Sequence, residues 1–231
     1  MRNKKIVRDG YNAIAARYFR DRARNAPDLE LLKDFVGHLP PGARVLDAGC
    51  GAGVPIAEFL SRSFLIVGFD FAPAQVRLAR LTVPLGEFLQ GDIVVLPFRE
   101  ATFDGIVCTY AMIHVPREEH PRLVAEFRRT VKPSGLLLLC MGANDLPENA
   151  GDFLGTPMYW SHYDANTNLE MVRVAGFEIC GRDSWTTRRA RARPICSSWP
   201  ARREGSAYDV VAMPWACSVS RTILIIPSGS L

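Results

Sequence analysis

The sequence lacks the marks of a membrane-spanning, secreted or zinc-binding protein. In 231 residues no apolar run approaches the ~20 residues that cross a bilayer, and no apolar stretch follows the charged start at Met1 to Lys5, as it does in a secretory signal. The six cysteines are scattered and form no C-x-x-C pair, so we expect no metal site. A net charge of +4 is too small to indicate nucleic acid binding by itself. These absences favour a cytoplasmic protein with one substantial domain, with or without an appendage.

A glycine-rich turn preceded by an acid is the most informative stretch, VLDAGCGAG at residues 45–53. A short apolar run, glycines and an apolar segment from Val54 to Leu60 predict a strand, a tight turn and a helix. Glycines at 49, 51 and 53 permit positive φ and let a ligand approach the backbone. A carboxylate at Asp47, the end of the strand, would repel a pyrophosphate but pair with an ammonium group. The spacing is also not the G-x-G-x-x-G of dinucleotide sites, because Val54 stands where the third glycine would fall.

Strand and helix patterns alternate along the chain, which predicts an α/β fold with a mostly parallel sheet and helices on both faces. Strands are expected at 64–70, 86–90, 103–109, 136–141 and from 176, and helices at 10–25, 28–38, 73–81, 117–131 and 165–175, the last capped by Asp164. Residues 132–135 predict a turn, and the polar stretch 142–156 predicts a loop. The last strands are uncertain.

Three acids recur at the ends of the first strands, and their surroundings resemble the motifs of class I S-adenosylmethionine (AdoMet) methyltransferases. Asp47 precedes the glycine turn, Asp70 ends the second strand 23 residues later, and Gly91-Asp92-Ile93 follows the third. The segment from Phe103 to Leu139 is similar to a strand-helix-strand of that family. The resemblance implies a Rossmann-like seven-stranded sheet, AdoMet as cofactor with S-adenosylhomocysteine as product, and no metal. It further implies methyl transfer to oxygen, nitrogen or carbon of a small molecule, by a monomer or homodimer.

The same resemblance assigns the cofactor site. Asp47 and the glycine turn would hold the methionine part, Asp70 the ribose hydroxyls, and Asp92 with Ile93 the adenine. Simpler interpretations stay open, because Asp before a helix is a common N-cap and Asp92 also suits a turn. The predicted cofactor-binding residues are Tyr11, Tyr18, Asp47, Ala48, Gly49, Gly51, Gly53, Asp70, Phe71, Asp92, Ile93 and Thr109.

The acceptor would bind beside the end of the fourth strand, under a lid made by helices within residues 1–40. The predicted acceptor-pocket residues are Tyr110, His114, Tyr159, Trp160 and Tyr163. His114 is the candidate general base if the acceptor must lose a proton, although a histidine there also fits as a packing residue. The aromatic stretch 157–163 has core packing as its alternative role. No Asn/Asp-Pro-Pro-Tyr motif follows the fourth strand, so a nucleic acid acceptor is not expected.

Residues 182–231 differ in character from the methyltransferase-like part at 1–181. This tail holds eight arginines and three of the four tryptophans but only three acids, and no lysine follows Lys132. It is a basic appendage for nucleic acid or an acidic partner, an out-of-frame segment, or a degenerate final hairpin, for which residues 208–213 and 222–226 are apolar enough. For the whole chain, an AdoMet-binding module without catalysis is the alternative function, and a nucleotide-dependent oxidoreductase is disfavoured by Asp47.

Overall fold

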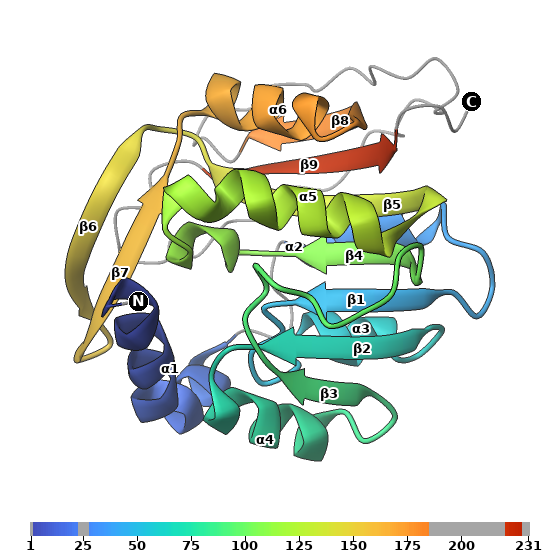
Figure 1. Cartoon of the computed structure of the whole chain (residues 1–231). Helices are drawn as coiled ribbons and strands as arrows, with labels where there is room; N and C mark the ends of the chain where they lie inside the picture. The colour runs from blue at the N-terminus through green and yellow to red at the C-terminus, as the bar shows by residue number, and fades with distance from the viewer. Residues whose placement is uncertain (1, 23–27, 185–219, 228–231) are drawn as a thin grey trace.

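A seven-stranded sheet with the order β3-β2-β1-β4-β5-β9-β8 forms the centre of the protein (Figure 1). The computed structural model describes residues 2–22, 28–184 and 220–227. The first five strands in this order are parallel, and β9 runs antiparallel to both β5 and β8. The strands are β1 (Arg44–Ala48), β2 (Leu65–Asp70), β3 (Glu87–Gln90), β4 (Phe103–Cys108), β5 (Val131–Gly142), β8 (Phe177–Ser184) and β9 (Ser220–Pro227). The predicted fold class is therefore confirmed.

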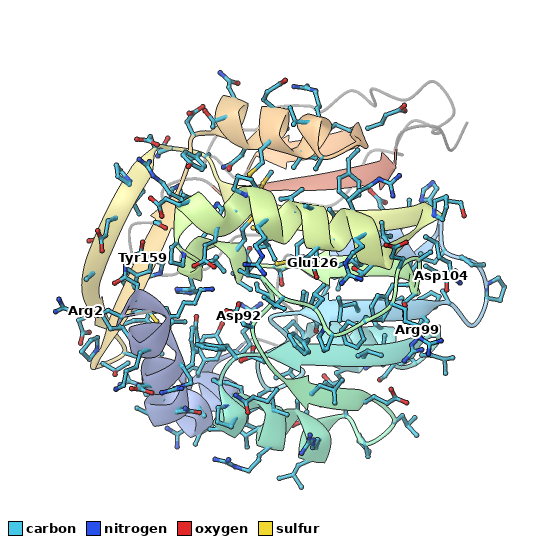
Figure 2. The ribbon with its side chains drawn as sticks, in the orientation of Figure 1. Arg2, Asp92, Arg99, Asp104, Glu126 and Tyr159 are labelled. Carbon is cyan, nitrogen blue, oxygen red and sulfur yellow. The ribbon has the colours of Figure 1, made fainter. Side chains whose placement is uncertain are left out.

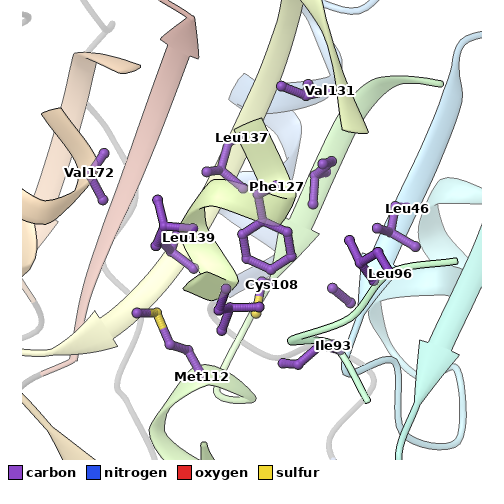
Figure 3. Packing of buried hydrophobic residues seen from close by; sticks show 14 of the residues in the cluster. Leu46, Ile93, Leu96, Cys108, Met112, Phe127, Val131, Leu137, Leu139 and Val172 are labelled. Atoms are coloured by element: carbon purple, nitrogen blue, oxygen red, sulfur yellow. The ribbon is translucent and has the colours of Figure 1, made fainter. Parts of the chain in front are cut away.

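Helices cover both faces of this sheet, because its central strands carry apolar side chains on both sides. One face packs against α5 (His120–Thr130) and α6 (Ala165–Val174), and the other packs against α2 (Asp28–Val36), α3 (Ile56–Leu60) and α4 (Pro73–Thr82). Figure 3 shows Phe127 of α5 inserted among Leu46, Cys108 and Leu137 of the strands. This two-sided core fixes the carboxyl ends of β1, β2 and β4 at one edge of the sheet.

A hairpin and the first helix lie beside that edge (Figure 1). The hairpin consists of β6 (Leu146–Phe153) and β7 (Thr156–His162), and α1 (Arg2–Asp21) packs on β7. Val7 and Ile14 of α1 share a buried cluster with Met158 and Tyr159 of β7. Gly10 permits this close approach, since a Cβ there would lie 2.8 Å from the carbonyl oxygen of Pro157. The helix is thereby held over the carboxyl ends of the strands.

The predicted loop at 142–156 is wrong, whereas the turn expected at 132–135 is a bulge within β5. Between Val131 and Leu136 strand β5 advances five residues while β4 advances only two, and a Cβ on Gly135 would lie 2.6 Å from the Val131 side chain. Within the supposed loop, β6 pairs with β7 through backbone groups while its residues 147–152 are exposed. An exposed strand without apolar alternation gives no sequence signal.

Other boundaries differ less. The first helix begins at Arg2 and ends at Asp21 instead of spanning 10–25, because Val7 and Gly10 already face β7. The expected helix 117–131 is split into a short 3₁₀ turn, η2 (Arg117–Glu119), followed by α5. A second 3₁₀ turn, η1 (Met112–His114), follows β4. None of the described helices combines the length and apolarity needed to span a membrane.

The tail beyond residue 181 is described only in part. Residues 222–226, proposed as apolar enough for the sheet edge, lie within β9, which pairs with β5 and β8. Most of the arginine-rich tail and the segment 208–213 fall outside the described residues. Its interpretation as appendage, frame-shifted segment or degenerate hairpin therefore stays a prediction.

Candidate cofactor site

The glycine turn after β1 has a backbone that only glycine adopts easily. Gly49, Gly51 and Gly53 have φ values of 84°, 53° and 81°. A Cβ on Gly49 would overlap the Cβ of Ala111, and the Gly49 N–H donates to the carbonyl of Phe69 at 2.7 Å. At Gly51, by contrast, a Cβ would meet nothing closer than 3.8 Å. Gly51 thus turns an open stretch of backbone toward the space above the strands.

Asp70 at the end of β2 joins the glycine turn to the loop before α4. Its two carboxylate oxygens accept hydrogen bonds from the backbone N–H groups of Gly51 at 2.8 Å and Ala72 at 2.9 Å. Burial raises the pKa of Asp70, while these backbone donors act in the opposite direction. Each carboxylate oxygen retains acceptor capacity, so a pair of ribose hydroxyls can bind the same group.

Asp92, after β3, forms an ion pair with the first helix, which the sequence analysis did not anticipate. One oxygen accepts from the Val94 N–H at 3.0 Å, and the other accepts from the Lys4 ammonium at 2.7 Å. Lys4 also donates to Glu119 at 2.6 Å. Burial acts to lower the pKa of Lys4, but the hydrogen bonds with the two carboxylates outweigh it and raise that pKa. Lys4 lies seven residues before Tyr11 and therefore on the same face of the helix. This spacing could have predicted Lys4 as a site residue.

These groups line one cavity, the cofactor cavity, of about 1010 Å³ including its open mouth. It lies between α1 and the carboxyl ends of the parallel strands, the position where ligands bind in open α/β sheets. Figure 2 shows Asp92 and Tyr159 on the side of the sheet where α1 and the hairpin lie, with Asp104 and Arg99 at the opposite edge. The cavity has the size and mixed lining of a small-molecule site.

Most predicted site residues line this cavity, and several residues that were not predicted join them. The predicted ones are Tyr11, Tyr18, Asp47, Gly49, Gly51, Asp70, Phe71, Asp92, Ile93, Thr109, Tyr110 and His114. The others include Lys4, Val7, Arg8, Phe19, Arg22, Cys50, Ala52, Val54, Ile56 and Val115. Four of the additions come from α1, whose first turns carry no recognisable motif, and Arg22 directly follows this helix.

Five predicted residues are not among those that line the cavity. Ala48 is fully buried within β1, and a Cβ on Gly53 would point at Ala79 of α4 and at Val83 directly after this helix. Tyr159 is buried against α1, and Trp160 contacts the His114 ring at 5.9 Å between centroids. Burial within the sheet and the hairpin explains why these side chains do not reach the cavity.

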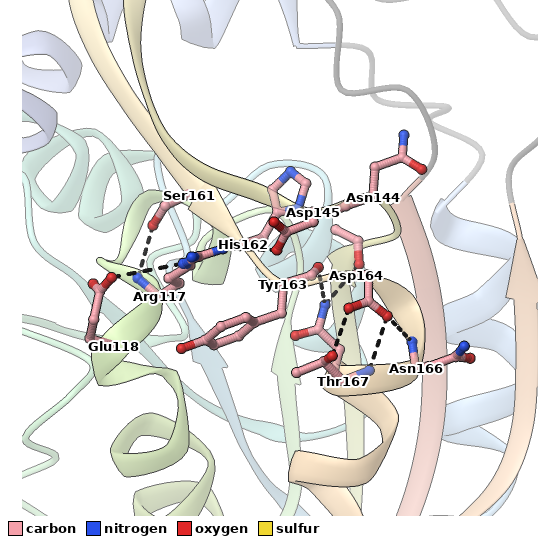
Figure 4. Close-up of polar contacts among 12 residues, drawn as sticks. Arg117, Glu118, Asn144, Asp145, Ser161, His162, Tyr163, Asp164, Asn166 and Thr167 are labelled. Atoms are coloured by element: carbon pink, nitrogen blue, oxygen red, sulfur yellow. Dashed lines mark hydrogen bonds and ion pairs between the residues drawn. The ribbon is translucent and has the colours of Figure 1, made fainter.

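Tyr163, the fifth, belongs to a polar cluster that fastens the hairpin to the loop after β4 (Figure 4). The Arg117 guanidinium lies over the Tyr163 ring at 4.9 Å and pairs with Asp145 at 2.8 Å. The Ser161 hydroxyl accepts from the Arg117 N–H at 2.9 Å and donates to the Val115 carbonyl at 3.1 Å. Asp164 caps α6, as predicted, by accepting from two backbone N–H groups. This cluster connects the hairpin to the loop after β4, and the role of Tyr163 in an acceptor pocket stays a prediction.

His114, the candidate base, is held between α1 and β7. Its Nδ1 lies 2.8 Å from the carbonyl oxygen of Tyr159, and its Nε2 lies 2.9 Å from the hydroxyl of Tyr11. A carbonyl only accepts, so Nδ1 carries the proton, and the neutral ring accepts from the Tyr11 hydroxyl at Nε2. Burial lowers the pKa of His114 to about 4, so the ring is neutral at pH 7.

The cavity fits a cofactor that combines an amino acid with a nucleoside. Gly51 offers bare backbone, Asp70 offers oxygens to paired hydroxyls, and Asp47, only 1% exposed, is the residue before the last in β1 and lines the cavity. The described residues contain no group of three or more metal-ligating side chains placed to hold a metal ion. The lining offers carboxylates, backbone N–H groups and aromatic rings to a ligand.

Comparisons with known proteins agree with this geometry. The family model described as "Methyltransferase domain" matches residues 45–135. The chain is 27% identical over 173 residues to malonyl-[acyl-carrier protein] O-methyltransferase of Serratia marcescens, which covers 75% of this chain and 67% of the relative. It is 30% identical over 141 residues to a tRNA (carboxymethyluridine(34)-5-O)-methyltransferase of Arabidopsis thaliana, which covers 61% of this chain and 33% of the relative.

Among solved structures, the fold matches that of Burkholderia thailandensis 1,6-didemethyltoxoflavin-N1-methyltransferase with bound S-adenosylhomocysteine. The TM-score is 0.66 at 18% identity, over 97% of this chain and 88% of the other. The chain spans about half the length of most curated relatives that it matches. Residues 45–135 therefore match a methyltransferase domain, and the chain is similar to AdoMet-dependent methyltransferases in sequence and in fold.

Proposed function

We propose that this protein binds AdoMet in the cofactor cavity and transfers its methyl group to a small-molecule acceptor. The observation that carries the proposal is the glycine turn bridged to Asp70, with Asp47 before it and Asp92 after the next strand, all lining one cavity. A sulfonium-bound methyl supplies its own electrophilicity, so the cofactor brings the chemistry. The protein's task is to bind, orient and exclude water.

Each part of the cavity has a binding role in this proposal. The carboxylate of Asp47 and the bare backbone around Gly51 hold the amino acid part, and Asp70 holds the ribose. Asp92 and Ile93 flank the adenine, and Lys4 orients the Asp92 carboxylate. Helix α1 closes the cavity from above and shields the reacting atoms from water, the lid role expected for residues 1–40.

Binding measurements test the cofactor assignment. Calorimetric titration of AdoMet and, separately, of NADH should show binding of AdoMet only. Asp70→Asn should weaken AdoMet binding about 10- to 100-fold, because a hydrogen bond to a charged acceptor contributes ~1.5–3 kcal/mol. Glu87→Gln is the matched control, since Glu87 starts β3 at the opposite end of the parallel strands and is exposed. Equal affinities for both variants would refute the assignment of Asp70.

Turnover separates the enzyme from an AdoMet-binding module without catalysis. An acceptor library is incubated with the protein and AdoMet, and S-adenosylhomocysteine is quantified by mass spectrometry. Release of this product with a small molecule, but not with bulk tRNA, supports the proposed acceptor class. Tight AdoMet binding with no product across the library would favour the non-catalytic module.

A further inference from the structure

The hydroxyl of Tyr11 lies 2.9 Å from Nε2 of His114, and both residues line the cavity. Tyr11 comes from α1 and His114 from the η1 turn after β4, so the pair forms only when α1 is docked. The Tyr11 and His114 rings meet edge to face at 5.3 Å, and the Trp160 ring lies 5.9 Å from the His114 ring in a tilted arrangement. This arrangement fixes both side chains.

The Tyr159 carbonyl determines the direction of the two hydrogen bonds that His114 makes. The Tyr159 carbonyl accepts from Nδ1–H, so Nε2 must accept the Tyr11 proton. The Tyr11 hydroxyl therefore donates its hydrogen bond to His114, and the phenolic oxygen can still accept a hydrogen bond from the side of the cavity. A hydroxyl on a bound acceptor has a place to donate its proton.

Resting on the proposed function, we propose that Tyr11 and His114 form a proton relay for O-methylation of a hydroxyl-bearing acceptor. The acceptor oxygen forms a bond to the methyl carbon while the methyl–sulfur bond breaks and sulfur keeps its electron pair. The acceptor proton passes to the Tyr11 oxygen as the Tyr11 proton passes to Nε2 of His114. The imidazolium then carries the positive charge that was on sulfur. Tyr11 is the catalytic residue that touches the acceptor, and Tyr159 positions His114 through its carbonyl.

The weak basicity of His114 is the reason why oxygen is the nucleophile that this relay serves. Burial lowers its pKa to about 4. A hydroxyl oxygen that is gaining a methyl group becomes a far stronger acid than this imidazolium. A methylated amine, with a pKa near that of lysine, is a weaker acid by about six pKa units, so its proton transfer is disfavoured about a millionfold. The residues packed on the ring, Tyr11 and Trp160, are uncharged at neutral pH.

The test uses paired aromatic probes, because the cavity wall around the relay includes Tyr11, Tyr18 and Phe19. Benzyl alcohol and 2-phenylethanol are compared with benzylamine and 2-phenylethylamine, because the methylated products of these amines are aliphatic amines with pKa values near that of lysine. The methylated products are identified by mass spectrometry. The relay predicts methylation of hydroxyl probes at least 10-fold faster than of the matched amines. Faster methylation of amines, or no methylation of any hydroxyl probe by protein that binds AdoMet, overturns it.

Two conservative variants test the relay itself. Tyr11→Phe removes the hydroxyl but keeps the ring, and His114→Asn keeps a donor for the Tyr159 carbonyl but removes the acceptor nitrogen. Each should lower the rate about 10²- to 10⁴-fold, the usual contribution of general acid–base catalysis. His38→Asn, at an exposed histidine outside the cavity, should retain the wild-type rate. A loss of less than threefold in Tyr11→Phe overturns the relay.

The pH profile separates a proton relay from a purely structural contact. The wild-type rate should be flat between pH 6 and 8, whereas the residual rate of Tyr11→Phe should rise up to about tenfold per pH unit, because the acceptor must then ionise in solution. A structural role would scale the rate without changing its pH dependence. ¹⁵N spectra of the histidine side chains in wild-type protein should show His114 protonated at Nδ1, and the opposite tautomer overturns the proposal even if a variant fails to fold. AdoMet binding to the wild-type protein is measured in parallel. Absence of this binding would show that the proposed function itself is wrong.

Discussion

Replacing Lys4 tests how the first helix is held over the cavity. Its ammonium group bridges Asp92 at 2.7 Å and Glu119 at 2.6 Å, and the Lys4 side chain is only 19% exposed. Lys4→Met keeps the aliphatic stem and removes both ion pairs. We expect α1 to dock less firmly, with Asp92 and Glu119 left without this cation.

The expected size of the effect follows from burial. Exposed ion pairs contribute ~0.2–1 kcal/mol each, and hydrogen bonds to charged groups contribute ~1.5–3 kcal/mol. The carboxylates here are 30% and 34% exposed, so solvent screening keeps each interaction near the lower end. The two together should contribute about 2 kcal/mol, equivalent to a fall of about 4–8 °C in Tm.

Lys5→Met is the matched control for this variant. Lys5 is the next residue, pairs with Asp9, and is 71% exposed, so its loss should cost under ~0.5 kcal/mol. Urea unfolding of both variants at low salt and at 1 M NaCl gives the comparison, and high salt should narrow the difference. AdoMet affinity should fall in Lys4→Met only. Equal stability and equal affinity of the two variants would refute the reasoning.

Two further predictions concern a buried histidine and the glycine turn. Burial lowers the pKa of His120 from 6.5 in the unfolded chain to about 4. The neutral ring therefore contributes up to about 3 kcal/mol to the free energy of unfolding, and this contribution is fully present above pH 6.5 and is lost as pH falls toward 4. Urea unfolding between pH 7 and 4.5 should show this loss, and His120→Gln should reduce the pH dependence by about half, because His114 keeps its own lowered pKa; an unchanged slope in the variant would contradict the assignment. Gly49→Ala should abolish AdoMet binding and cost over ~2 kcal/mol, because positive φ is combined with overlap on Ala111. Gly155→Ala, with a similar φ but open space around it, should cost only ~1 kcal/mol and bind normally, as thermal unfolding and calorimetry would show.

The strands and the acids at their ends were predictable because both depend on local sequence. Continuous apolar runs marked β1, β2, β4 and most of β5, since strands buried on both faces need no polar side. Asp47 and Asp70 were found because each directly follows such a run, and Asp92 was found because it follows the short third strand after Gly91. Hairpin strand β6 was missed, because its pairing depends on backbone groups while its side chains face water.

The acceptor side of the site was the least predictable part. Tyr159, Trp160 and Tyr163 were predicted to line the acceptor pocket. The structure places Tyr159 and Trp160 against α1 and Tyr163 against the loop after β4. Lys4 and Arg22 reach the cavity only because a 20-residue helix crosses the strand ends. Sequence spacing within one helix does not show which distant element that helix will pack against.

The sequence by itself determined the parallel sheet, the glycine turn and the carboxylates around it, because each is specified by residues a few positions apart. The tertiary structure decided which groups meet across the cavity. Tyr11 and His114 are 103 residues apart, and their hydrogen bond exists only because Gly10 lets α1 approach β7. Lys4 and Asp92 likewise meet through that packing. Contacts of this kind depend on the complete core, since the free energy that docks the helix comes from apolar burial distributed along β7 and α1.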